Sequence, residues 1–149
     1  MSEEPIIRRV WVLNGPNLGR LGSREPEVYG HVSHDDLTQA CQQAGQSLDL
    51  AVEVQQTDDE SQLIAWLHDA ADQQIPVVLN PAAFTHYSYA LRDAVASRTA
   101  PLIEVHLTNP AAREEFRHNS VIAGVASGTI AGFGLASYLL ALQAIAHEP

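Results

Sequence analysis

Short apolar segments alternate with helical patterns along the chain, and this alternation constrains the fold more than any other feature. Residues 10–13, 77–79 and 102–107 are predicted to be strands that are buried on both faces. Residues 51–55 are more polar and predict an edge strand, and a last strand is expected within residues 124–130. Five strands that alternate with helical segments indicate a parallel sheet with helices on both faces.

Two of the helical segments begin with residues that commonly cap helices. Ser33 precedes Asp36 by three positions, and Thr57 precedes Glu60 by the same spacing, so both pairs fit a capping box. Apolar residues at helical spacing follow each pair. The sequence therefore predicts two helices with side-chain caps in the first half of the chain.

Three further helices are expected in the second half of the chain. One covers about residues 87–97. Asn109 followed by Pro110 is typical of a helix N-terminus, and it predicts a short helix that carries residues 113–116. The final helix, at about residues 133–147, is apolar over much of its surface, which indicates either burial or a contact with another subunit.

The basic residues limit the chemistry, because all eight are arginine and the chain contains no lysine. Catalysis through a lysine Schiff base and a Walker-type phosphate-binding loop are therefore excluded. The net charge of −10 disfavours nucleic acid and anionic membranes as partners. An anionic ligand would need arginines that are gathered locally, against the overall charge.

Length, cysteine content and hydropathy indicate a cytoplasmic protein of one domain. The domain is expected to span residues 1–149, with residues 1–7 as a flexible N-terminus. The single cysteine, Cys41, cannot form an internal disulfide and is expected on the apolar face of a helix. No apolar segment approaches the roughly 20 residues of a membrane span, and the acidic N-terminus lacks the apolar core of a signal peptide.

Polar side chains collect where the predicted strands end, which is where ligands bind in open α/β sheets. The fourth strand carries Glu104 and His106, and Thr108 beyond it lies on the same face. A histidine in an apolar strand is often a satisfied core residue, but a buried carboxylate needs a partner, so these two are expected to pair. A metal site of His86, Glu104 and His106 is conceivable, although no ligand pair at helical spacing supports it.

The segments after the first and fourth strands also carry candidate site residues. Asn14 is most simply a turn or cap residue. The long segment that follows it is typical of a lid or binding loop, and this favours roles for Arg24 and Tyr29 beyond those of ordinary surface residues. Arg113 and Arg117 are either solvent-exposed helix charges or groups that bind an anion.

Seven short motifs occur in order between about residues 10 and 144. The first three are LNGPNL from residue 13, GSREP from residue 22 and VYG from residue 28. The others are TH from residue 85, LRDA from residue 91, IEVH from residue 103 and AREEFRH from residue 112. With these motifs the chain resembles the type II 3-dehydroquinate dehydratases over nearly its whole length.

The resemblance implies a fold, a reaction and an assembly. The fold is α/β, a flavodoxin-like three-layer sandwich with a five-stranded parallel sheet and an active-site lid loop at residues 19–30. The reaction is the anti elimination of water from 3-dehydroquinate through an enolate, which yields 3-dehydroshikimate in the shikimate or quinate pathway. The family uses no cofactor and no metal, and it assembles as a homododecamer, a tetramer of trimers.

The resemblance also implies roles for individual residues. Tyr29 matches the proton acceptor, and Arg24 matches the cation that keeps this tyrosine deprotonated and stabilises the transition state. His106 matches the proton donor, with Glu104 in support, and Asn17 matches an amide that stabilises the enolate. The positions that match substrate-binding residues are Asn80, His86, Leu107, Thr108, Arg117, Asp93 from a neighbouring subunit, and Arg113 from the lid region.

The chain departs from the family pattern at two places. Ala82 stands where a glycine is expected, and its β-carbon would be unfavourable if the position requires a positive φ. Pro110 and Ala111 replace a more usual Val-His pair, which affects substrate positioning more than chemistry. A flavin-binding module is disfavoured because residues 14–17 lack hydroxyl groups, whereas a catalytically inactive assembly or small-ligand-binding protein is the alternative to an enzyme.

Overall fold

The computed structural model describes residues 6–23 and 25–148 of the chain. The predicted flexibility of residues 1–7 falls largely on residues 1–5, which lie outside the described residues. The strands are β1 (Arg8–Asn14), β2 (Leu50–Gln56), β3 (Val77–Asn80), β4 (Leu102–His106) and β5 (Gly128–Ala131). The α-helices are α1 (Pro26–Tyr29), α2 (His34–Ser47), α3 (Glu60–Gln73), α4 (Tyr89–Ala96) and α5 (Leu135–Ala146).

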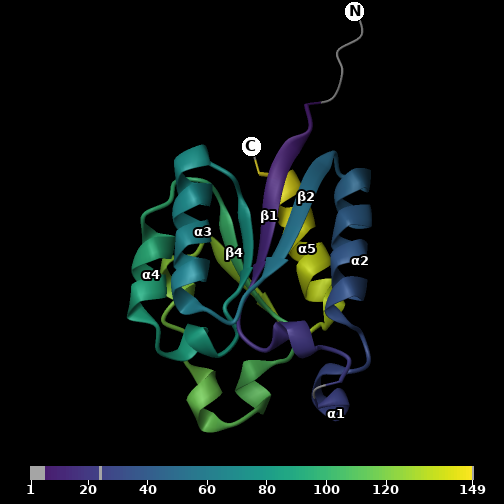
Figure 1. The fold of residues 1–149 in the computed structure, drawn as a ribbon, viewed down its shortest axis with the longest axis vertical. Coiled ribbons are helices and arrows are strands. Elements are labelled where there is room, and N and C mark those ends of the chain that lie inside the picture. Colours follow the sequence, from purple (N-terminus) through teal and green to yellow (C-terminus); the bar gives the residue numbers. More distant parts are fainter. Residues whose placement is uncertain (1–5, 24, 149) are drawn as a thin grey trace, which may run out of the picture.

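All five strands are parallel, and their order in the sheet is β2-β1-β3-β4-β5. This order is that of flavodoxin-like folds. Helices α2 and α5 cover one face of the sheet and α3 and α4 cover the other, which gives three layers (Figure 1). The predicted fold class is therefore confirmed, and β2 lies at an edge of the sheet as its polar sequence indicated.

The central strands bury both of their faces, which explains their apolar sequences. In β1, Val10 and Val12 belong to the cluster beneath α2 and α5, while Leu13 belongs to the cluster beneath α3 and α4. In β3, Val78 contributes to the first cluster and Leu79 to the second. Each cluster removes large side chains from water, and this burial is the main favourable free energy of folding.

One predicted helix cap is confirmed and the other is wrong. The Ser33 side chain accepts from the Asp36 amide and the Asp36 carboxylate accepts from the Ser33 amide, both at 3.0 Å, which completes the capping box of α2. Helix α3 instead begins after Asp59, whose carboxylate accepts from the Ser61 amide at 2.9 Å. Thr57 cannot cap α3 because its hydroxyl is engaged in the preceding turn, where it accepts from the Asp59 amide.

The predicted helix around residues 113–116 is replaced by two short 3-10 turns, at Pro110–Ala112 and Glu115–His118. Asn109 does cap the first turn, since its side chain accepts from the Ala111 amide at 3.1 Å. The turn ends at Arg113, which has an extended backbone with φ −110° and ψ −162°. The break directs the Arg113 side chain to a different place from the one it would have on a continuous helix.

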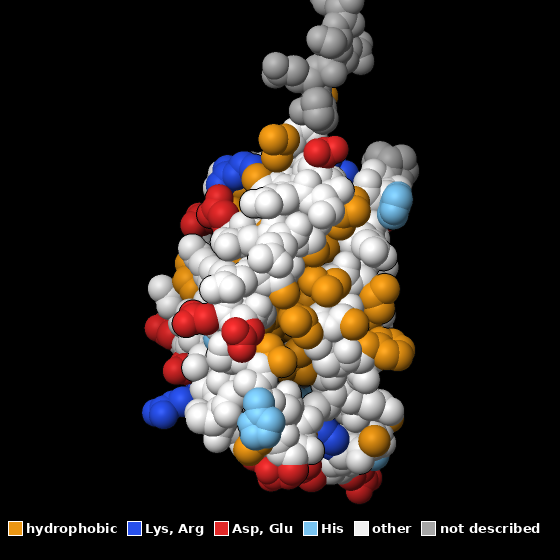
Figure 2. All heavy atoms as spheres, turned by 90° about the vertical axis from the view of Figure 1, so that its right-hand side faces the viewer, with side chains coloured by type: hydrophobic (Ala, Val, Ile, Leu, Met, Phe, Trp, Pro, Cys, Tyr) orange, Lys and Arg blue, Asp and Glu red, His pale blue; other side chains and the backbone are white. Residues whose placement is uncertain are grey.

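Helix α5 is apolar mainly because it is buried against the sheet. Its residues Tyr138, Ala141, Leu142 and Ile145 have no exposed surface. Leu140 is 43% exposed, and apolar side chains form a band along the face of the molecule that carries α2 and α5 (Figure 2). A subunit contact on this face stays a prediction. No helix among the described residues is both long enough and apolar enough to cross a membrane.

Cys41 lies on the buried face of α2, as its helical spacing predicted, and burial raises the pKa of its thiol to about 12. Because the thiolate is the reactive form, we expect the native protein to resist a thiol-specific disulfide reagent at pH 8. Reaction over minutes should be stoichiometric only after unfolding in guanidinium. Rapid reaction of the native protein would contradict this prediction.

Candidate active site

A pocket lies beyond the carboxyl ends of β1, β3 and β4, at the lower end of the sheet in Figure 1. The segments that follow these strands, together with α1, supply its walls. This location agrees with the rule that parallel α/β sheets bind ligands at this edge. The residues that line it are Pro16, Asn17, Leu18, Tyr29, Asn80, Ala82, Ala83, His86, His106, Leu107, Thr108, Pro110, Arg113 and Arg117.

Tyr29 and Arg113 meet in this pocket although 84 positions separate them in the sequence. Nη1 of Arg113 donates to the Tyr29 hydroxyl at 2.8 Å, and its guanidinium carbon lies 5.2 Å from the centre of the Tyr29 ring. Nη1 also contacts Oγ1 of Thr108 at 3.4 Å. A guanidinium in this position stabilises negative charge on the phenolic oxygen. Arg24, the predicted cation, lies outside the described residues.

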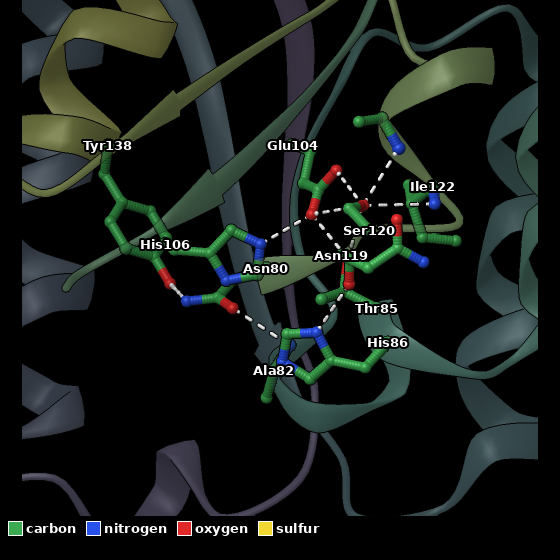
Figure 3. A network of polar contacts seen from close by, with 11 residues as sticks. Asn80, Ala82, Thr85, His86, Glu104, His106, Asn119, Ser120, Ile122 and Tyr138 are labelled. Carbon is green, nitrogen blue, oxygen red and sulfur yellow. Dashed lines mark hydrogen bonds and ion pairs between the residues drawn. The ribbon is translucent and has the colours of Figure 1, made fainter. Parts of the chain in front are cut away.

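Glu104 holds His106 in one orientation, as the sequence predicted. Nε2 of His106 donates to Oε2 of Glu104 at 2.5 Å, which leaves Nδ1 as the ring nitrogen for a ligand (Figure 3). Two hydroxyls, from Thr85 and Ser120, also donate to the Glu104 carboxylate. Ser120 in turn accepts from backbone amides at the start of the next segment. The buried carboxylate is therefore surrounded by donors.

Sequence reasoning missed Thr85 and Ser120. Thr85 precedes a predicted site residue, so its position next to His86 was a usable signal. No motif or spacing points to Ser120, which reaches Glu104 because its segment lies against Thr85 and His86, where the Val121 amide donates to the Thr85 carbonyl at 2.8 Å. The hydroxyls of Thr85 and Ser120 also lie 3.0 Å apart, so the two residues form one unit around the carboxylate (Figure 3).

The ionised form of Glu104 is favoured in spite of its burial. Burial by itself raises the pKa of this carboxyl, but hydrogen bonds from His106, Thr85 and Ser120, with the charge of His106, outweigh burial and lower the pKa. Since the folded state then binds a proton less tightly than the unfolded chain, Glu104 stabilises the fold above about pH 4.5. This stabilisation is lost as the pH falls further.

We expect Glu104→Gln to lower the free energy of unfolding by about 1.5–3 kcal/mol at pH 7, the range for hydrogen bonds to a charged group. The difference from the wild type should shrink at pH 3.5, because there the Glu104 carboxyl binds a proton more readily in the unfolded chain than in the folded protein. Urea unfolding at both pH values, at one protein concentration, measures this. An equal deficit at the two pH values would contradict ionic stabilisation.

Asn80 and His86, two of the predicted substrate-binding residues, line the pocket, and each is held by the protein. Asn80 is 2% exposed; its Oδ1 accepts from the Ala82 amide at 3.0 Å and its Nδ2 donates to the Tyr138 hydroxyl at 2.8 Å. Nδ1 of His86 donates to the carbonyl of Asn119 at 2.8 Å. The other ring nitrogen of His86, Nε2, is therefore the one available to a ligand (Figure 3).

The expectation that Asn14 is a turn or cap residue is wrong. Its side chain is fully buried at the end of β1, where Oδ1 accepts from the Tyr138 hydroxyl at 2.7 Å and Nδ2 lies 3.0 Å from Nε2 of His34. A local turn would leave the amide exposed, whereas helix α5 brings a buried hydroxyl to it. Asn14 therefore belongs to a polar network beneath the pocket.

The remaining predicted residues divide into those that line the pocket and one that does not. Arg117 lines it and is held by Glu114 through a 2.9 Å contact between Nε and the carboxylate. Asn17, Leu107 and Thr108 also line it. Asp93 does not, since it lies on the outer surface of α4, where its carboxylate contacts Arg92 at 3.3 Å with 78% of its side chain exposed.

Both the sequence and the fold of this chain are similar to those of known proteins. The family model described as Dehydroquinase class II matches residues 8–146. The chain belongs to the class II dehydroquinase family. The 3-dehydroquinate dehydratase of Salinispora tropica is 59% identical over 138 residues, which are 93% of this chain and 96% of the relative. That of Mycobacterium tuberculosis is 53% identical over 137 residues, 92% and 93% of the two chains.

A solved structure extends the likeness from sequence to fold. The crystal structure of the type II dehydroquinase from Propionibacterium acnes has a TM-score of 0.93 and 54% sequence identity. The match covers 95% of this chain and 97% of that one. The resemblance inferred from the motifs is thus confirmed, and the class II dehydroquinase fold described above is that of the family.

The departure from the family pattern at Ala82 has a structural consequence in this class II dehydroquinase. Ala82 has a φ of 52°, in the left-handed region that a glycine would adopt without strain. The chain nevertheless keeps the 3.0 Å hydrogen bond from the Ala82 amide to Asn80. Gly15 lies opposite, and a β-carbon on it would come within 2.7 Å of the carbonyl oxygen of Pro81. The first and third strand ends are thus in close contact.

The conceivable metal site of His86, Glu104 and His106 is not supported. Glu104 and His106 are bonded to each other, and Nδ1 of His86 is turned to the carbonyl of Asn119. Within residues 6–23 and 25–148, no three His, Cys, Asp or Glu side chains are grouped so as to hold a metal ion.

Proposed function

We propose that this class II dehydroquinase is a hydro-lyase that converts 3-dehydroquinate to 3-dehydroshikimate and water. The observation that carries the proposal is one pocket lined by an arginine-bound tyrosine, Tyr29, and a carboxylate-bound histidine, His106. The first supplies a base and the second an acid, which are the two groups that elimination of water requires. Relatives that align over nearly their whole length are named for this activity.

The first step is removal of the proton on the carbon next to the ketone. The Tyr29 phenolate takes this proton, and the electron pair moves to the ketone oxygen to form an enolate. Arg113, at 2.8 Å from the Tyr29 hydroxyl, stabilises the phenolate before the transfer. The lid loop of residues 19–30 closes over the substrate and adds Arg24, while Asn17 stabilises the charge on the enolate oxygen. Donors that are already in position do this without reorganising.

The second step is loss of the β-hydroxyl group. The enolate electrons re-form the ketone, the adjacent carbon–carbon double bond forms, and the carbon–oxygen bond of the leaving group breaks. His106 delivers its Nδ1 proton to the departing oxygen, so that water leaves instead of hydroxide. Glu104, bonded to Nε2, fixes the ring and stabilises its protonated form. A proton then passes from Tyr29 to His106 by way of solvent to complete the cycle.

Arginines gathered at the pocket explain how an acidic chain binds an anionic substrate. Arg117 is the group for the substrate carboxylate, and Asn80, His86, Leu107 and Thr108 hold the ring and its hydroxyls. We expect Arg117→Ala to raise KM about 10–100-fold, since a charge-assisted hydrogen bond contributes about 1.5–3 kcal/mol, with a smaller effect on kcat. Arg9→Ala, at the opposite end of β1, is the control. An unchanged KM would assign the carboxylate to another residue.

The direct test is an assay of the purified chain with 3-dehydroquinate. The product is a conjugated enone, so its formation raises the ultraviolet absorbance. Absorbance that rises in proportion to enzyme concentration supports the proposal. A folded protein without turnover would favour the alternative of an inactive assembly or binding protein, and a yellow, flavin-containing preparation would indicate a different function.

The proposal includes a cytoplasmic homododecamer made of four trimers. Asp93 lies on the exposed face of α4, away from the pocket of its own chain, and it extends into the site of a neighbouring subunit in this assembly. Light scattering should then give a mass of twelve times the 16.2 kDa chain. A monomer that is fully active would remove Asp93 from the site.

A further inference from the structure

Beneath the pocket, four side chains form a single line of hydrogen bonds, of which three are buried and the last, His34, is half-buried. The Ala82 amide donates to Oδ1 of Asn80 at 3.0 Å, and Nδ2 of Asn80 donates to the Tyr138 hydroxyl at 2.8 Å (Figure 3). The Tyr138 hydroxyl donates to Oδ1 of Asn14 at 2.7 Å. Nδ2 of Asn14 lies 3.0 Å from Nε2 of His34, the first residue of α2.

The direction of every bond in this line follows from its first donor. A backbone N–H can only donate, so Oδ1 of Asn80 must face Ala82 and Nδ2 must face Tyr138. The Tyr138 hydroxyl then accepts from Asn80 and gives its one proton to Asn14. Nδ2 of Asn14, which can only donate, is left facing His34. Turning over Asn80 would place Nδ2–H against the Ala82 N–H, and turning over Asn14 would leave the proton of the buried Tyr138 hydroxyl without an acceptor.

We propose that His34 is a positioning residue that holds the Asn80 amide in its orientation. Its imidazole is neutral and carries its proton on Nδ1, so that Nε2 is the last acceptor of the line. The proposal rests on the proposed function, because Asn80 then presents the second hydrogen of Nδ2 to a substrate hydroxyl. His34 acts from outside the pocket, since it is not among the residues that line it.

The surroundings of the network favour these protonation states. Tyr138 has no exposed surface, and burial raises the pKa of its hydroxyl well above the ordinary value, so it stays protonated and donates. Burial lowers the pKa of His34, and the negative charge of Asp35 on the same helix opposes this only in part. A protonated His34 would place Nε2–H against Nδ2–H of Asn14, an arrangement without an acceptor.

The first experiment tests the network without any substrate. Nitrogen NMR of protein labelled with ¹⁵N in its histidine rings distinguishes a protonated ring nitrogen from an accepting one. The His34 signals are assigned by their absence in His34→Gln. We expect Nδ1–H with unprotonated Nε2 at pH 7.5. The opposite tautomer, or a charged ring, would overturn the proposal, and this result does not depend on what the enzyme acts on.

The second experiment tests positioning through a matched pair of variants. His34→Leu removes the acceptor, and we expect KM to rise about tenfold with kcat changed less than threefold. His34→Gln offers Oε1 to Asn14 and should return KM to within about threefold of the wild type. His68→Leu, the same change on the exposed face of α3, is the control. A role in stability alone would lower the melting temperature of both His34 variants and leave KM unchanged.

The two experiments separate failure of this inference from failure of the proposed function. If the wild type does not turn over 3-dehydroquinate, the proposed function fails. The His34 tautomer measured by NMR then still shows whether the hydrogen bonds of the network run in the inferred direction. If the wild type is active and His34→Leu keeps the normal KM, His34 does not position Asn80. Equal KM values for the Gln and Leu variants, both raised, would show that an acceptor at this position is not what matters.

Discussion

Tyr29→Phe is expected to lower kcat by about 10²–10⁴-fold, the usual contribution of a general base, while KM changes little. The substitution removes only the hydroxyl, so the ring can keep its packing beneath the Arg113 guanidinium. Steady-state kinetics with 3-dehydroquinate measure the effect. The melting temperature of the variant should equal that of the wild type, which shows that the fold is intact. Tyr87→Phe is the control, because Tyr87 is 58% exposed and does not line the pocket.

Isotope exchange distinguishes loss of the base from a general disturbance of the pocket. In deuterium oxide, a working base exchanges the proton next to the ketone of the substrate. Tyr29→Phe should abolish this exchange together with turnover. Near-normal turnover, or exchange that continues without turnover, would show that a group other than Tyr29 is the base.

His106→Ala should also lower kcat by about 10²–10⁴-fold, but at a different step. Proton removal by Tyr29 remains possible, so exchange with deuterium oxide should continue while water is no longer lost. The barrier rises because hydroxide must leave without a proton. Proton NMR of 3-dehydroquinate follows both processes in one sample, and His68→Ala, on the exposed face of α3, is the control.

The contrast between these two variants tests the assignment of base and acid. The expected pattern is that Tyr29→Phe loses exchange and elimination, while His106→Ala loses elimination alone. If His106→Ala also stopped exchange, His106 would be needed for enolate formation, and its assignment as the proton donor of the second step alone would be wrong. Full activity in His106→Ala would exclude it as the proton donor.

Much of the fold follows from patterns that are local in the sequence. Strands that are buried on both faces must be apolar throughout, and helices on both faces require the periodic pattern between them, so the five-stranded parallel sheet was predictable. The Ser33 capping box is equally local and was confirmed. The predicted capping box at Thr57 was wrong because the Thr57 hydroxyl accepts from the Asp59 amide in the turn before α3. Which residue caps the helix depends on the path of the chain into it.

The site was predictable where its residues lie at strand ends and not where distant segments meet. Glu104 and His106 share one face of β4, so their pairing followed from strand geometry. Ser120 reaches the same carboxylate from a later segment, and Asn14 is buried only because Tyr138 of α5 reaches it. Such contacts depend on how elements pack, which spacing along the chain does not encode.

A parallel α/β fold, polar residues at the carboxyl edge of its sheet and a chemistry without lysine follow from residue type and local period, and all three can be inferred without a structure. The contact between Arg113 and Tyr29 cannot, because it arises only when the chain is folded. The two residues are 84 positions apart, and they meet because the chain is extended at Arg113 between two 3-10 turns. A hydrogen bond acts over about 3 Å, so two suitable side chains form one only if the folded backbone brings them that close.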